Sequence, residues 1–169
     1  MKRTYSVPGL CAAAKKNFCY EMKDGKLYLA DKYGTFALKT ADSSLLEELK
    51  KRPGVTLEEK SVAYTLGNIL NYKNRVDIRD TGITVPKKGI GKCRVLRSQG
   101  EDDNRIIWVN EKLLDPFKPV LILGADYKSP VTLICPDCFA IIMPVNYRAM
   151  DKKNKIAATL LALDEALNN

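Results

Sequence analysis

The sequence predicts an α+β fold within one domain of ordinary size. The chain has 169 residues, of which 46% are hydrophobic, enough to form a single core. Segments rich in alanine, leucine, lysine and glutamate alternate with short apolar runs, and Asp-Gly, Pro-Gly and glycine-rich pairs separate them. Together these features predict a few short helices among many short strands.

The first third predicts a helix, three strands and a second helix. Alanine and lysine favour a helix over residues 10–17, which follows a proline suited to a first turn. Asp24-Gly25 is typical of a hairpin turn between two strands. Residues 43–52 begin with serine, carry early glutamates and end in basic residues, so we expect a serine-capped helix. The expected strands are 18–22, 26–30 and 35–39.

The middle of the chain predicts a hairpin and a basic loop. Turn residues at Asp80-Thr81-Gly82 predict a hairpin between strands 75–78 and 81–85. The segment Lys87-Lys88-Gly89-Ile90-Gly91-Lys92 is expected to be a loop, followed by a short strand over residues 93–96 and a polar turn over 99–104. Residues 61–71 fit a strand or a helix.

The last third repeats the order of the first. A strand over residues 105–109 leads to Asn110, which can cap a short helix over 111–117. Three strands are expected after it, over residues 119–123, 131–134 and 139–143. Residues 10–39 and 110–145 therefore both read as a helix and then three strands, which indicates two related halves or a chance similarity of α+β units. The spacing of Ile156, Leu160, Leu163 and Leu167 predicts a helix over residues 151–167.

The charge of the chain indicates a polyanionic partner. The net charge is +8 and the isoelectric point is near 9.2. The excess of basic residues lies within residues 1–124, because the remainder carries equal numbers of basic and acidic side chains. Such a field favours nucleic acid, and the alternative is a surface kept soluble by lysine.

Catalytic and cofactor motifs are missing from the sequence. It contains no histidine and no G-x-S-x-G motif, and the lysine loop at 87–92 lacks the spacing of a P-loop. We therefore expect neither an enzyme nor a cofactor. No run approaches the roughly 18 apolar residues that span a bilayer, so we expect no membrane association and a cytoplasmic location.

Five cysteines include one close pair. Without a signal peptide, the odd set fits a reducing compartment better than a disulfide framework. Cys135 and Cys138 form a CxxC that can supply two corners of a tetrahedral zinc site. A closed site needs four ligands, and the alternative is a turn in which both cysteines act as small apolar residues.

Several short motifs follow one another in the last third of the chain. They are Trp108-Val109-Asn110 with Leu113-Leu114-Asp115, then Ser129-Pro130 before a strand, and a closing strand that ends in Met143-Pro144. This series resembles the last part of the final domain of the bacterial sliding clamp, the β subunit of the replicative DNA polymerase. The segment Asp24-Gly25-Lys26-Leu27, with Ala30-Asp31 and Tyr33-Gly34, resembles a stretch of the same family. Together these motifs cover about half of the chain.

The resemblance implies a processivity-clamp fold. Two short helices would pack on antiparallel sheets with pseudo-twofold halves, as one domain over residues 1–146, followed by a helical extension over 147–169. Helices of the family present lysine and arginine to double-stranded DNA without reading bases, and a ring would require self-association or partners. The family usually ends near its closing strand, so we expect the extension to cover a groove of this chain or of a neighbour.

The candidate site residues form two groups. Lysines of the first helix, the basic loop and the helix after Asn110 would contact the nucleic-acid backbone, although Glu111 and Asp115 offset the last of them. These are Lys15, Lys16, Lys87, Lys88, Lys92 and Lys112. By position in the family, Ile141, Met143 and Pro144 would line a peptide-binding groove, and the alternative is that they belong to an edge-strand core.

These observations give one leading hypothesis and two alternatives. The leading hypothesis is a non-catalytic, clamp-like accessory protein of DNA replication or repair, with DNA and replication proteins as partners. One alternative is a protein-interaction module that keeps the clamp fold without encircling DNA. The other is a small zinc-binding regulator that uses Cys135 and Cys138.

Overall fold

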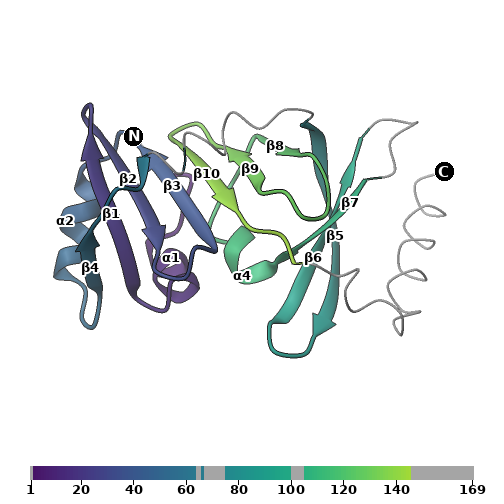
Figure 1. The fold of residues 1–169 in the computed structure, drawn as a ribbon, viewed down its shortest axis with the longest axis horizontal. Coiled ribbons are helices and arrows are strands. Elements are labelled where there is room, and N and C mark those ends of the chain that lie inside the picture. The colour runs from purple at the N-terminus through teal and green to yellow at the C-terminus, as the bar shows by residue number, and fades with distance from the viewer. Residues whose placement is uncertain (1, 64–65, 67–74, 100–104, 146–169) are drawn as a thin grey trace.

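The computed structural model describes residues 2–63, 66, 75–99 and 105–145, which form three short helices and one ten-stranded sheet (Figure 1). The α+β prediction is confirmed. The helix expected over residues 151–167, the extension over 147–169 and most of residues 61–71 lie outside the described residues. No helix in the described ranges is long and apolar enough to cross a membrane.

The first six elements include the four strands at one end of the sheet. Helix α1 spans Val7–Ala13 and is followed by three strands in antiparallel order. Helix α2 spans Ser44–Lys51, and a further strand pairs in parallel with the first. These strands are β1 (Asn17–Lys23), β2 (Lys26–Asp31), β3 (Phe36–Thr40) and β4 (Thr56–Glu59).

The other end of the sheet is built from the second half of the chain. A long hairpin and a third strand precede helix α4 (Glu111–Leu114), after which three antiparallel strands return to the centre. The strands are β5 (Val76–Lys87), β6 (Gly91–Ser98), β7 (Ile106–Asn110), β8 (Leu121–Gly124), β9 (Val131–Ile134) and β10 (Cys138–Ile142).

Two runs of the same order meet at the middle of the sheet. The strand order is β4-β1-β2-β3-β10-β9-β8-β5-β6-β7, so β1-β2-β3 is followed by β10-β9-β8 in mirrored order. A helix precedes each run, and α1 lies against α4 (Figure 1). The N–H of Ser6 donates to the carbonyl of Pro116 over 2.7 Å, and Tyr5 pairs with Phe117 across the junction.

One large core joins both halves. Leu10, Leu38 and Leu133 are fully buried in it, together with the α4 leucines. The rings of Phe18 and Phe36 meet edge to face, with their centroids 6.4 Å apart. A smaller cluster around Trp108 lies under the β5–β6 hairpin.

Strand β7, at the far edge of the sheet, contacts the segment that follows the central strand β10. Val109 of β7 pairs with Pro144, just after β10, and the N–H of Val145 donates to the carbonyl of Trp108 over 2.7 Å. Part of the edge of β7 is therefore covered by the chain's own backbone, which reduces the number of exposed donors and acceptors there.

Four local expectations are corrected by the structure. The first helix begins at Val7, because the side chain of Ser6 accepts the N–H of Gly9, and it ends before Lys15. Ser43 makes no capping bond with its side chain, and Asp42 accepts the N–H of Ser44 instead. The helix after Asn110 ends at Leu114, and strand β4 was not expected.

The hairpin expected across Asp80-Thr81-Gly82 is also wrong. Strand β5 continues through this segment as a bulge, where Asp80 and Thr84 are successive partners of β6. The true turn lies between Lys87 and Gly91, in the segment expected to be a loop. Gly91 has a φ of 104°, which glycine adopts without strain.

Candidate nucleic-acid and peptide-binding surfaces

Lys15 and Lys16 lie just after α1, and the expectation that they lie on the helix is wrong. Both have left-handed backbone conformations, with φ of 50° and 60°, that turn the chain into β1. The side chains are exposed. The ammonium of Lys16 donates to the carbonyl of Pro53 over 3.3 Å, and that of Lys15 lies 5.3 Å from the centre of the Tyr33 ring. With Arg52 they border an open depression of about 490 Å³ beside α1.

Lys87, Lys88 and Lys92 come together at the tip of the β5–β6 hairpin. Lys92 pairs with Pro86 and Lys87 with Gly91, which leaves Lys88 in the turn. Lys88 and Lys92 are exposed and Lys87 is half-buried. The hairpin turn thus gathers three positive charges within a few residues. The sequence shows this grouping, but it does not show that the lysines lie at the tip of a hairpin.

Lys112 is exposed on α4, in a setting of mixed charge. Its neighbour Glu111 accepts from the guanidinium of Arg94 over 2.8 Å, and Asp115 does so over 3.3 Å. Arg94 also binds Asp80 over 2.6 Å. Burial raises the pKa of Asp115, and the nearby Glu111 adds to this effect. The acidic side chains around Lys112 therefore weaken the local positive potential, as the sequence indicates.

The candidate lysines occupy three places rather than one. They lie after the end of α1, at the tip of the β5–β6 hairpin and on α4. Lysine acts on phosphate as a point charge and needs no fixed geometry. A long polyanion can therefore use lysine groups that are separate from one another.

Ile141 and Met143 line an apolar cavity of about 270 Å³. Its walls come from the β2–β3 turn, the end of β10 and the segment after β4, with Lys32 and Lys60 among the lining residues. Ile141 is buried against Ala37 and Leu66, whereas Met143 is only half-buried. The N–H of Met143 donates to the carbonyl of Thr35 over 2.8 Å, which fixes this end of the wall.

Pro144 does not line this cavity and instead pairs with Val109. The structure thus brings together two of the three residues that the sequence assigned to a groove. It adds Cys19, Ala37 and Val62, which sequence reasoning did not name. Ala37 comes next to Ile141 through the pairing of β3 with β10, which no local pattern in the sequence specifies.

Neither a family model nor a curated protein nor a solved structure matches this chain. The resemblance to the sliding clamp therefore stays a prediction based on short motifs.

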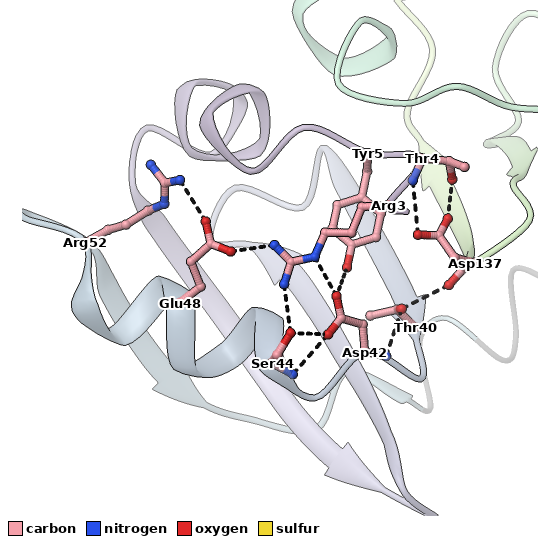
Figure 2. Close-up of polar contacts among 9 residues, drawn as sticks. All are labelled: Arg3, Thr4, Tyr5, Thr40, Asp42, Ser44, Glu48, Arg52 and Asp137. Atoms are coloured by element: carbon pink, nitrogen blue, oxygen red, sulfur yellow. Dashed lines mark hydrogen bonds and ion pairs between the residues drawn. The ribbon is translucent and has the colours of Figure 1, made fainter. Parts of the chain in front are cut away.

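A polar cluster at the start of the chain was missed by sequence reasoning (Figure 2). Arg3 binds Asp42 over 2.6 Å and also pairs with Glu48, while the hydroxyl of Tyr5 donates to Asp42 over 2.8 Å. Between them, Thr4 donates to the carboxylate of Asp137. The cluster joins the N-terminal segment to α2 and to the β9–β10 turn.

This cluster controls the ionisation of Asp42. Burial raises the pKa of Asp42, but hydrogen bonds from Arg3, Ser44 and Tyr5 outweigh burial and hold that pKa below its usual range. Burial and the bond to Asp42 raise the pKa of Tyr5. The signal in the sequence was Asp42 itself, two residues before α2, where a carboxylate caps a helix well.

Cys135 and Cys138 are both buried at the β9–β10 turn. In the described part of the chain, no three cysteine or acidic side chains are grouped so as to hold a metal ion. Cys11 lies on α1, Cys19 on β1 and Cys93 on β6. A hydrogen bond from Cys138 lowers the pKa of Cys135 against the effect of burial, and the same bond, with burial, raises the pKa of Cys138.

Proposed function

We propose that this chain is a non-catalytic, sliding-clamp-like accessory protein that binds DNA during replication or repair. The observation that carries the proposal is the mirrored order β1-β2-β3 and β10-β9-β8, each run preceded by a helix, with α1 against α4. Two pseudo-twofold halves with adjacent helices are what the resemblance to processivity clamps implies. The step from fold to function is one of analogy.

The distribution of charge supports contact with phosphates rather than with bases. Five of the six candidate lysines are exposed, and the sixth, Lys87, is half-buried at the tip of a hairpin. An excess of basic charge favours binding that is independent of sequence and weakens steeply as salt rises.

Duplex DNA binding at several salt concentrations tests the proposal. We expect the wild-type chain to bind duplexes of unrelated sequence with equal affinity. The variant K87Q/K88Q/K92Q should bind more weakly at low salt and show a shallower dependence on salt, by about one unit of slope for each phosphate that the variant no longer neutralises. The variant K15Q/K16Q should show a smaller change in the same direction.

A matched control removes the same kind of charge elsewhere. Lys23 and Lys26 flank the β1–β2 turn and are exposed. K23Q/K26Q should leave binding close to wild type. If the control weakened DNA binding as much as the candidate variants do, only net charge would matter. If the wild-type chain did not bind duplex DNA at low salt, the proposal would be wrong. Light scattering on the same samples measures whether the chain assembles into a ring.

A second candidate function is a protein-interaction module that uses the same fold. The observation that favours it is the apolar cavity at Ile141 and Met143, with Lys32 and Lys60 among its lining residues. Such a cavity suits a short peptide with an apolar anchor next to a carboxylate. The two functions are compatible, since the cavity and the hairpin lysines lie on different elements.

Selection from a displayed peptide library tests this second candidate. We expect wild-type protein to enrich peptides that share an apolar residue beside an acidic one, and M143E to lose them. M22E is the matched control, because Met22 is 43% exposed on β1 and does not line the cavity. Loss of binding in both variants, or in neither, would contradict a peptide site at this cavity.

A further inference from the structure

The two cysteines of the CxxC face each other across the β9–β10 turn. The N–H of Cys135 donates to the carbonyl of Cys138 over 3.0 Å, and the adjacent residues Ile134 and Phe139 are partners in the sheet. Residues opposite each other in a hydrogen-bonded antiparallel pair have Cα atoms about 5.5 Å apart. Disulfides join Cα atoms about 4.4–6.8 Å apart, so this backbone geometry fits a disulfide.

The two thiols also point to the same side. Both are buried in the main core, at 6% and 4% exposure, and each thiol lies close enough to shift the pKa of the other. The other cysteines lie apart on α1, β1 and β6. Among the cysteines, all of which the structure describes, this is the pair placed for direct bonding.

The environment gives the pair distinct roles. The hydrogen bond from Cys138 lowers the pKa of Cys135, whereas donation of that bond, together with burial, raises the pKa of Cys138. The thiolate is the attacking species in disulfide exchange. Cys135 is therefore the first nucleophile, and Cys138 keeps its proton until the second step.

We propose that Cys135 and Cys138 are a reversible redox pair that closes to a disulfide by exchange with a small-molecule disulfide. The Cys135 thiolate attacks one sulfur of the small disulfide, forms a mixed disulfide and releases one thiolate. Cys138 loses its proton and attacks the sulfur of Cys135, which releases the second thiolate. The protein loses two electrons and two protons, and the small disulfide is reduced to two thiols. This inference is independent of the proposed function.

The position of the pair links its redox state to the N-terminal segment (Figure 2). Asp137 lies within the turn, where its carboxylate accepts from Thr4 and its carbonyl accepts from Thr40 over 3.0 Å. Closing the disulfide would join the two residues on either side of Asp137 covalently. We therefore expect the amide of Thr4, which donates to Asp137, to exchange with solvent at different rates in the oxidised and reduced proteins.

Equilibration in glutathione buffers of graded ratio tests the proposal. After acid quenching and unfolding, the remaining thiols are alkylated and counted by mass. We expect the folded protein to lose two of its five thiols as the fraction of oxidised glutathione rises, with the missing pair mapped to residues 135 and 138. C138S should instead retain glutathione on Cys135, and C135S should show neither product. C19S is the matched control and should behave as wild type.

Three outcomes would overturn the proposal. The first is a folded protein that keeps all five thiols in buffers that oxidise the guanidinium-unfolded chain. The second is a loss of two thiols that persists in C135S and C138S, because another pair would then be responsible. The third is a stoichiometric zinc ion in the purified protein that is released by either substitution.

Discussion

The backbone N–H of Thr4 donates to the carboxylate of Asp137 over 3.0 Å, across a sequence separation of 133 residues. The hydroxyl of Thr4 binds the same carboxylate. On either side, Arg3 and Tyr5 bind Asp42 (Figure 2). One short segment therefore ties the β9–β10 turn to the start of α2, at the end of the sheet where β3 finishes and β10 begins.

Removing the hydroxyl of Thr4 should show how much its hydrogen bond to Asp137 contributes to the free energy of unfolding. Thr4→Val keeps the shape of the side chain and leaves only the backbone bond to Asp137. Because hydrogen bonds to charged groups contribute about 1.5–3 kcal/mol, we expect a loss in that range in the free energy of unfolding. Urea denaturation gives the value. The control is Thr56→Val on the exposed face of edge strand β4, and equal losses in the two variants would contradict the assignment.

Acid should weaken the protein through Asp42. Its pKa is depressed in the folded state, so its contribution is present above the unfolded value of about 3.9 and is lost as pH falls below it. Asp42→Asn should therefore lower the free energy of unfolding at neutral pH, and the difference from wild type should shrink below about pH 4. Denaturation at a series of pH values gives both curves. Asp24→Asn, at an exposed turn, should follow the wild type, and a difference for Asp42→Asn that does not change with pH would refute the explanation.

Local sequence signals predicted most of the strands because their causes are local. The Asp24-Gly25 turn lies where expected, with Gly25 at a φ of 70°, and the antiparallel partners on either side follow from it. Strand β9 has the expected bounds, since a short apolar run bounded by Pro130 and Pro136 leaves little room for another register.

Other features were set by pairing partners that no local pattern reveals. Asp80-Thr81-Gly82 has turn chemistry, yet the chain continues as a strand because the hydroxyl of Thr81 donates to the carbonyl of Val95 over 2.7 Å. Strand β4 is a largely exposed edge strand in which only Leu57 is partly buried, so it carries no apolar alternation. The candidate site shows the same contrast between local and long-range features. The sequence predicted that Ile141 and Met143 lie in one groove, but it did not predict the hydrogen bond from Thr4 to Asp137.

A methyl group added at Gly124 should overpack the core. A Cβ at this position would lie 2.6 Å from Cδ1 of Ile107 and 3.0 Å from Cγ1 of Ile78. Ile107 is fully buried and cannot swing away, so we expect Gly124→Ala to cost about 1–3 kcal/mol in the free energy of unfolding.

The clash at Gly124 can be relieved in a second variant. Ile107→Val removes Cδ1, the closest atom, so G124A/I107V should lose less stability than the sum of the two single variants. Thermal unfolding of all four proteins gives the coupling. If the stability losses of the two single variants simply added in the double variant, the added methyl group would be clashing with an atom other than Cδ1 of Ile107.

Arg94 should stabilise the protein by neutralising three carboxylates. Its guanidinium binds Asp80 on β5, Glu111 on α4 and Asp115 just after α4, and its side chain is 18% exposed. Arg94→Met would leave three acidic groups close together, although water partly screens Asp80 and Asp115, which are 33% and 57% exposed. Since each exposed ion pair contributes about 0.2–1 kcal/mol, we expect a loss of about 1–2 kcal/mol at neutral pH.

The dependence of that loss on pH distinguishes charge from packing. Burial and Glu111 raise the pKa of Asp115 and Arg94 opposes them, so without the guanidinium the folded variant protonates Asp115 before the unfolded chain does. The deficit relative to wild type should therefore shrink between pH 7 and pH 4. Arg94→Lys keeps one charge but cannot reach all three carboxylates, and it should fall between the other two proteins. A deficit of the same size at both pH values would mean that Arg94 acts through the packing of its aliphatic stem.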